Sequence, residues 1–249
     1  AIFRGALWCM SVMSSGNGFS NRGISRLAAI PRHTGTRFHV PILMGFLIAD
    51  AVLILLHSGL GLLFLQGSIA TFPDILRIDR DWALGEILNY IKWLVLAGLS
   101  ALLLNRHKQV IFLGFVLFSV VALLDDSLQL HERFASTLVA AIAPGLDLPP
   151  GAGELIFIAA EGIAVAGTLV YGWIKAPFII RRLTVPLFLF LGGAAFCAAA
   201  IDFLHVYTPA YSILGGIVGI LEDGGEMVFL SLAVGHAAGL SLQAQAAPA

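Results

Sequence analysis

The chain is poor in charged residues. Asp, Glu, Lys and Arg make up 12% of its 249 residues, whereas soluble globular domains carry about 25%. Hydrophobic residues make up 59%, and the mean hydropathy is +0.93. This composition excludes a soluble protein and predicts an all-α, polytopic membrane protein with the lipid bilayer around it. With a net charge of −1, we expect no nucleic-acid partner.

The chain is also poor in cysteine, since Cys9 and Cys197 are its only two. Two cysteines this far apart do not predict a disulfide framework, and they exclude a metal site of the Cys-x-x-Cys type. The last apolar segment contains no lysine that could form a retinal Schiff base, so a rhodopsin is excluded as well.

Six apolar segments are long enough to cross the hydrocarbon core of a bilayer, which takes about 20 helical residues. They lie at 40–65, 81–104, 110–134, 153–174, 184–207 and 212–240. We therefore predict a transmembrane bundle of six helices at residues 40–240, followed by a short C-terminal tail at 241–249. Residues 1–39 are rich in Arg, Ser and Gly without an acid. They are typical of a basic cytoplasmic segment, and an organelle transit peptide is the alternative.

The basic residues predict the orientation, because Lys and Arg concentrate in cytoplasmic loops. The N-terminal segment, the connection around residues 105–109 and the connection at 175–183 are all basic, and all three belong to the same side of the predicted bundle. We therefore expect both termini in the cytoplasm and the protein in a bacterial inner membrane.

Eleven carboxylates lie inside the predicted helices, although an ionisable side chain within a bilayer costs at least about 2.5–3.5 kcal/mol. Counting along the helices places all but one in the outer half of the membrane. Spacings of three, four or seven residues let most helices turn their acids to one face. The eleven are Asp50, Glu86, Asp125, Asp126, Glu132, Glu154, Glu161, Asp202, Glu222, Asp223 and Glu226.

Two basic side chains have ambiguous roles. Lys92 lies in the middle of the second predicted helix, where it either reaches toward the interface or pairs with an acid such as Asp50, the one acid near the membrane centre. His131 projects away from Asp125 if their helix is regular, unless His131 belongs to a frayed helix end.

Three short polar runs carry the candidate metal ligands. The run at 125–132 combines hard carboxylate oxygens with an imidazole, a set that suits Zn, Fe, Mn or Ca. Asp202 and His205 have the carboxylate-x-x-His spacing of di-iron bundles, although only one such pair is present. Glu222 and Glu226 lie one helical turn apart. The expected ligands of a divalent metal ion, whose identity the sequence does not give, are Asp125, Asp202, His205, Glu222 and Glu226.

These patterns predict an outward-facing cluster of carboxylates and histidines inside the membrane. The leading hypothesis is a membrane-embedded enzyme, hydrolytic or oxidative, that acts on a lipid or another apolar small molecule. Glu86 or Glu161 would accept the proton, and a metal-bound water would be the nucleophile in the hydrolytic version. One alternative is a proton- or cation-coupled transporter, against which the almost purely apolar inner halves argue. The other is a small integral subunit of a larger complex, with a membrane-protein partner.

Overall fold

The computed structural model describes residues 38–142, 144–145, 148–149, 151–209 and 211–243. The predicted basic segment at 1–39 therefore lies almost entirely outside the described residues, as does most of the tail at 241–249. The described residues form helices and no strand, which confirms the all-α fold class.

The described chain makes six helical passes along the bundle, joined by two short elements, η1 (Asp74–Leu76) and α6 (Leu130–Ile142). The first four passes are single helices: α3 (Val40–Leu65), α4 (Leu84–His107), α5 (Val110–Leu128) and α7 (Ala152–Lys175). The fifth joins α8 (Phe178–Phe196), η2 (Cys197–Ile201) and α9 (Asp202–His205). The sixth joins α10 (Ile213–Gly219), η3 (Ile220–Gly224) and α11 (Gly225–Gln243).

Within the described residues, the first five passes are long and apolar enough to cross a membrane, and the sixth is not among them. The multi-pass membrane class is therefore supported, while the predicted count of six spans is not confirmed. The starts and ends of the passes lie within three residues of the predicted segments, except at the end of the third and the start of the fifth, because an apolar stretch of this length must satisfy its backbone hydrogen bonds internally. The fifth pass begins at Phe178 rather than at residue 184, so Arg181 and Arg182 lie in the first turns of α8 rather than in a connection.

The predicted span at 110–134 is wrong at its outer end. Helix α5 stops at Leu128, and Gln129 adopts a left-handed conformation with φ 53° and ψ 46°. A non-glycine residue pays about 1–2 kcal/mol for this conformation. The chain then restarts as α6, so Glu132 lies on a separate helix rather than at the end of a transmembrane one.

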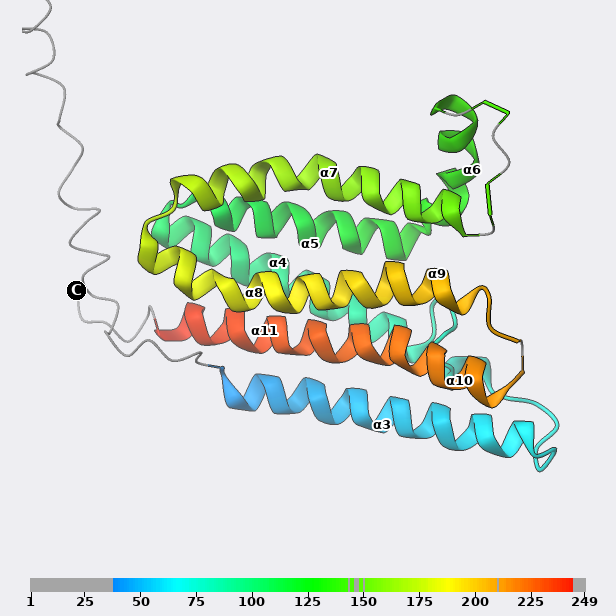
Figure 1. Ribbon diagram of the computed structural model, residues 1–249. Coiled ribbons are helices and arrows are strands. Elements are labelled where there is room, and N and C mark those ends of the chain that lie inside the picture. Colours follow the sequence, from blue (N-terminus) through cyan, green and yellow to red (C-terminus); the bar gives the residue numbers. More distant parts are fainter. Residues whose placement is uncertain (1–37, 143, 146–147, 150, 210, 244–249) are drawn as a thin grey trace, which may run out of the picture.

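The passes pack around α11, which contacts α3, α4 and α8. On the other side, α5 packs between α4 and α7. Figure 1 shows α3 and α7 at opposite edges of the bundle. Large apolar side chains from four passes form the buried core, including Leu96, Phe112, Phe115, Leu187 and Leu230.

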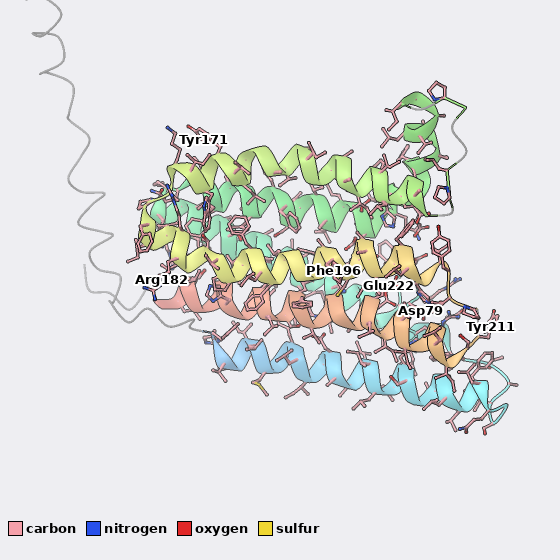
Figure 2. All side chains as sticks on the ribbon, in the orientation of Figure 1. Asp79, Tyr171, Arg182, Phe196, Tyr211 and Glu222 are labelled. Carbon is pink, nitrogen blue, oxygen red and sulfur yellow. The ribbon has the colours of Figure 1, made fainter. Side chains whose placement is uncertain are left out.

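The start of α3 and the end of α11 lie at the same end of the bundle, because the His39 N–H donates to the Gly235 carbonyl oxygen at 2.9 Å. Arg182 and Tyr171 also lie at this end, whereas Glu222 and Asp79 lie toward the opposite end (Figure 2). We call the end with Glu222 and Asp79 the acidic end.

Candidate functional site

A cavity of about 540 Å³ lies at the acidic end, between α4, the α5–α6 junction, η2 and η3. We call it the polar cavity. Arg80 and His131 are the basic side chains among its described lining residues. Ten carboxylates line it: Asp79, Asp81, Glu86, Asp126, Glu132, Glu154, Asp202, Glu222, Asp223 and Glu226.

Two π-helical turns, η2 and η3, hold part of this lining, and the two turns contact each other. A π-helical turn inserts one extra residue into an α-helix and changes the direction of the following side chains, and such turns occur frequently at functional sites. Asp202 follows η2 directly, while Glu222 and Asp223 lie within η3. The close approach depends on Gly225, since a Cβ there would lie 2.7 Å from the Cys197 sulfur.

Asp202, Glu222 and His205 form a connected polar group. The His205 Nδ1 lies 2.6 Å from Glu222 Oε2, and the Asp202 carboxyl lies close to the Glu222 carboxyl. Carboxyl groups this crowded in a site of low polarity are expected to share protons or to bind cations.

The break at Gln129 brings His131 back onto Asp125. The His131 backbone N–H donates to Asp125 Oδ1 at 2.8 Å, and Nδ1 lies 3.0 Å from Oδ2. The Asp125 carboxylate thus orients the imidazole, with Nδ1 as the donor. Nε2 lies 3.9 Å from Glu132 Oε1, beyond hydrogen-bonding distance.

His131 lies on α6, outside the candidate spans. Burial disfavours the imidazolium, but the hydrogen bond and the charge of Asp125 outweigh this effect and raise the pKa of His131 to about 9. His131 is therefore charged at neutral pH.

A second cavity, of about 360 Å³, lies deeper in the bundle between α5, α7 and the junction of α8 with η2. We call it the apolar cavity, because most of its lining is aliphatic or aromatic. Small residues on facing helices leave this space open, among them Ala159, Gly162, Ala195 and Ala198. Its polar lining residues are Asp125, Asp126, His131, Glu161 and Glu226.

The two cavities share Asp126, His131, Ala198 and Glu226 in their linings. Asp126 is fixed in this common wall by the Trp93 indole, whose Nε1 donates to Asp126 Oδ2 at 3.1 Å. Carboxylates and an oriented imidazole therefore separate a polar space from an apolar one.

Glu86 and Glu161, the two predicted proton acceptors, lie in different surroundings. Glu86 is in the first turn of α4, and its carboxylate accepts a hydrogen bond from the Trp82 backbone N–H, which ties the preceding connection to the helix. Glu161 lines the apolar cavity. The structure does not bring these two residues into one cavity, because Glu86 lines only the polar one.

Lys92 lies beneath the floor of the polar cavity and pairs with Asp50, as one of the two sequence-based alternatives predicted. Nζ lies 2.5 Å from Asp50 Oδ1, and it also donates to Asn89 Oδ1 at 3.1 Å and to the Met227 carbonyl at 3.0 Å. Asn89 and Met227 both line the cavity. The Ser231 hydroxyl donates to the other Asp50 oxygen at 2.5 Å, so the pair ties α3, α4 and α11 together.

A third space, of about 830 Å³, lies at the outer surface between α3, the connection 66–83 and the α9–α10 turn. It shares Asp79 and Asp202 with the polar cavity. Arg77 binds Asp79 through two hydrogen bonds, of 2.6 and 3.1 Å. Burial works against ionisation of Asp79, but its hydrogen bonds to Arg77 and the arginine charge prevail and lower the pKa of the Asp79 carboxyl.

The five expected metal ligands are only partly brought together. Asp202, Glu222 and Glu226 line the polar cavity, His205 pairs with Glu222 and lines the outer space, and Asp125 lines the apolar cavity. Across the described residues, no group of three or more His, Cys, Asp or Glu side chains is close enough to hold a metal ion. The structure gives the metal prediction no support, and the prediction itself stays untested.

Sequence reasoning did not include Asp79 among the candidate residues, because Asp79 lies between the apolar segments rather than inside one. Asp126 belongs to the predicted acid cluster, although it was not among the expected ligands. For His131, the alternative of a frayed helix end is nearer to the structure than a regular helix, because the break at Gln129 turns His131 back to Asp125. The sequence gives no signal for the left-handed Gln129, whereas Asp79 could have been flagged by its position beside Arg77 and Arg80 near the acidic end.

Comparison with known proteins identifies the family of this chain but does not indicate an activity. No curated protein and no solved structure matches the chain. Residues 45–238 match the family described as a domain of unknown function, DUF8692. Because this match covers more than half of the chain and includes residues of all six helical passes, the chain belongs to the DUF8692 family.

Proposed function

We propose that this protein is a membrane-embedded enzyme that acts on the polar head of an amphiphilic molecule. The head group would occupy the polar cavity, and the hydrocarbon chain would occupy the apolar cavity. The observation that carries this proposal is the common wall of the two cavities, in which Asp126, His131 and Glu226 face both spaces. Acid–base groups thus lie where the head and the chain of such a molecule would meet.

The proposed reaction is a hydrolysis with general acid–base catalysis. A carboxylate of the common wall, Asp126 or Glu226, would accept a proton from water as the water oxygen attacks the substrate. His131, oriented by Asp125, would donate its Nε2 proton to the leaving group as the bond to that group breaks. His131 then regains a proton from the carboxyl group that accepted one from water, so the cycle closes with one water molecule consumed.

The apolar cavity offers a lateral route for such a substrate. Ala159, Gly162 and Ala195 line this cavity and are also exposed on the flank of the bundle. In a membrane this flank faces lipid, so a chain could enter sideways between α7 and α8 without passing through water. The outer space, which shares Asp79 and Asp202 with the polar cavity, would supply water from the other side.

The divalent metal ion expected from the sequence is not part of this proposal. Asp202, Glu222 and Glu226 line the polar cavity, but no three His, Cys, Asp or Glu side chains among the described residues are close enough to hold an ion. The acid–base roles proposed for His131 and its partners do not depend on it.

A proton- or cation-coupled transporter is the second candidate, and one observation favours it. The inner half of the bundle contains buried polar side chains, including Ser100, Ser241 and His236. Ser100 Oγ, Ser241 Oγ and His236 Nδ1 have no hydrogen-bond partner among the described residues. The inner half is thus less purely apolar than its composition predicted, and the Lys92–Asp50 pair lies between it and the polar cavity.

The experiment is a turnover assay on protein reconstituted into vesicles of a bacterial total-lipid extract. Mass spectrometry would follow each lipid class over time for the wild type, for His131→Gln and for Arg133→Gln, a control on the same helix whose exposed side chain bonds Gln129. We expect one class to be consumed and its cleavage product to appear, with loss of turnover in His131→Gln alone. If wild type and His131→Gln leave the lipids equally unchanged, the hydrolase proposal fails and the transporter becomes the better candidate.

A further inference from the structure

The polar cavity has far more acid than base in its walls. Its ten carboxylates exceed Arg80 and His131 by eight. Carboxylates this close cannot all be ionised unless protons or cations lie between them. Asp79 pairs with Arg77 and Glu222 with His205, but most of the other acids have no cationic partner among the described residues.

Asp223 supplies an independent sign of a missing donor. Its Oδ2 atom is buried and has no hydrogen-bond partner among the described residues, although Asp223 lines the polar cavity. A buried acceptor without a donor costs about 1–3 kcal/mol, and more when it is charged. A ligand that donates hydrogen bonds into this cavity would satisfy it.

The lining also distinguishes between kinds of cation. Proteins bind quaternary ammonium groups mainly through aromatic side chains, which attract a cation that has no N–H to donate. None of the described residues that line the polar cavity is Phe, Tyr or Trp. Carboxylates and the amides of Asn89 and Gln129 prevail instead, and these accept hydrogen bonds from an ammonium that carries protons.

We infer that the ligand of this site is a single-chain amphiphile whose head carries a primary ammonium group, with this ammonium among Asp202, Glu222, Asp223 and Glu226 and the chain in the apolar cavity. This inference rests on the proposed function, because it takes the two cavities as one amphiphile site and names the head group. The apolar cavity has the volume of about twelve water molecules, so it accommodates one chain of medium length rather than two.

The test uses a dodecylamine brominated at the chain end, with the trimethylammonium and alcohol analogues as comparators. Bromine quenches tryptophan fluorescence on contact, and Trp93 lines the apolar cavity. The protein, with its other three tryptophans changed to Phe, is placed in nanodiscs of zwitterionic lipid at neutral pH. We expect saturable quenching by the amine, with an affinity at least about tenfold above those of both comparators.

Two pairs of variants make the result specific. Gly162→Phe places a ring in the apolar cavity, and nothing lies within 4 Å of a Cβ at this position, so the helix tolerates it. Gly167→Phe is its control, since it lies on the same helix with equally open space but away from the cavity. Gly162→Phe should abolish quenching by all three probes, and Gly167→Phe should leave it unchanged.

The second pair tests the polar cavity. Asp223→Asn should weaken binding of the amine about tenfold and leave binding of the alcohol unaffected, whereas Asp74→Asn, outside the polar cavity, should change neither.

Each outcome has a defined meaning. If the amine and the alcohol bind equally, and Gly162→Phe blocks both, the amine inference is overturned while the amphiphile site stands. If the trimethylammonium analogue binds as tightly as the amine, the requirement for N–H donors is overturned. If no probe gives saturable quenching that Gly162→Phe removes, the amphiphile site itself is refuted, and the proposed function with it.

Discussion

Asp50 and Lys92 form an ion pair in which both side chains are completely buried, with 2.5 Å between Oδ1 and Nζ. They come from α3 and α4, 42 residues apart in the chain. Helix α3 is otherwise peripheral, since Asp50 is its one buried residue. The pair therefore anchors α3 to the rest of the bundle. Lys92 also bonds Asn89 and Met227, which line the polar cavity.

Replacing one partner of this pair should lower the free energy of unfolding more than replacing both partners with apolar residues. Lys92→Met alone leaves a buried carboxylate without its cation, a change that costs about 3–5 kcal/mol in soluble proteins. Asp50→Leu combined with Lys92→Met should recover most of that loss, because two apolar residues need no partner. Thermal unfolding in detergent measures both. Lys175→Met, at an exposed position, is the control and should change stability little; equal losses in single and double variants would contradict the anchoring role.

His131 should make stability depend on pH in the alkaline range. Its folded-state pKa of about 9 lies above the unfolded value of about 6.5. The protonated imidazole therefore contributes fully to the free energy of unfolding below pH about 6.5, and this contribution is lost as the pH rises through about 9. We expect the wild type to exceed His131→Gln in unfolding temperature at pH 6, with the difference shrinking toward pH 10. In an Asp125→Asn background the pH dependence of the difference should become much smaller, because the hydrogen bond and the charge of Asp125 contribute most to the raised pKa; if it persists unchanged, Asp125 is not the cause.

Elemental analysis tests whether a metal or shared protons accompany the acids of the polar cavity. Because the described residues contain no group of three or more ligands close enough to hold an ion, we expect the purified protein to carry no stoichiometric divalent metal. A chelator should then leave the unfolding temperature unchanged. A stoichiometric ion that Glu222→Gln removes, together with destabilisation by the chelator, would restore the metal centre predicted from the sequence.

The orientation in the membrane follows from the distribution of Lys and Arg and can be measured by cysteine labelling. With Cys9 and Cys197 changed to Ser, a cysteine at Ser68 should react with an impermeant reagent added to intact cells. A cysteine at Lys108 should react only after the membrane is opened. Both positions are exposed at opposite ends of the bundle. The reverse pattern would place the acidic end in the cytoplasm.

Parts of the site could be predicted because depth in a helix follows directly from residue number. The acids of the second, third, fifth and sixth predicted helices were placed in one half of the membrane, and Asp126, Asp202, Glu222 and Glu226 do line one cavity. The assignment of Asp125 to that same cavity failed. Its carboxylate is turned to His131 instead, since the helix breaks between them.

The sequence by itself determined the membrane class, the helical fold, the approximate helix ends and the Asp50–Lys92 pairing as one of two alternatives. These follow from hydropathy and from helical spacing, which are local properties of the chain. The tertiary structure alone decided the left-handed Gln129, the two π-helical turns and the division into a polar and an apolar cavity. Each of these depends on contacts between distant segments, such as η2 with η3, whose packing offsets the local conformational cost.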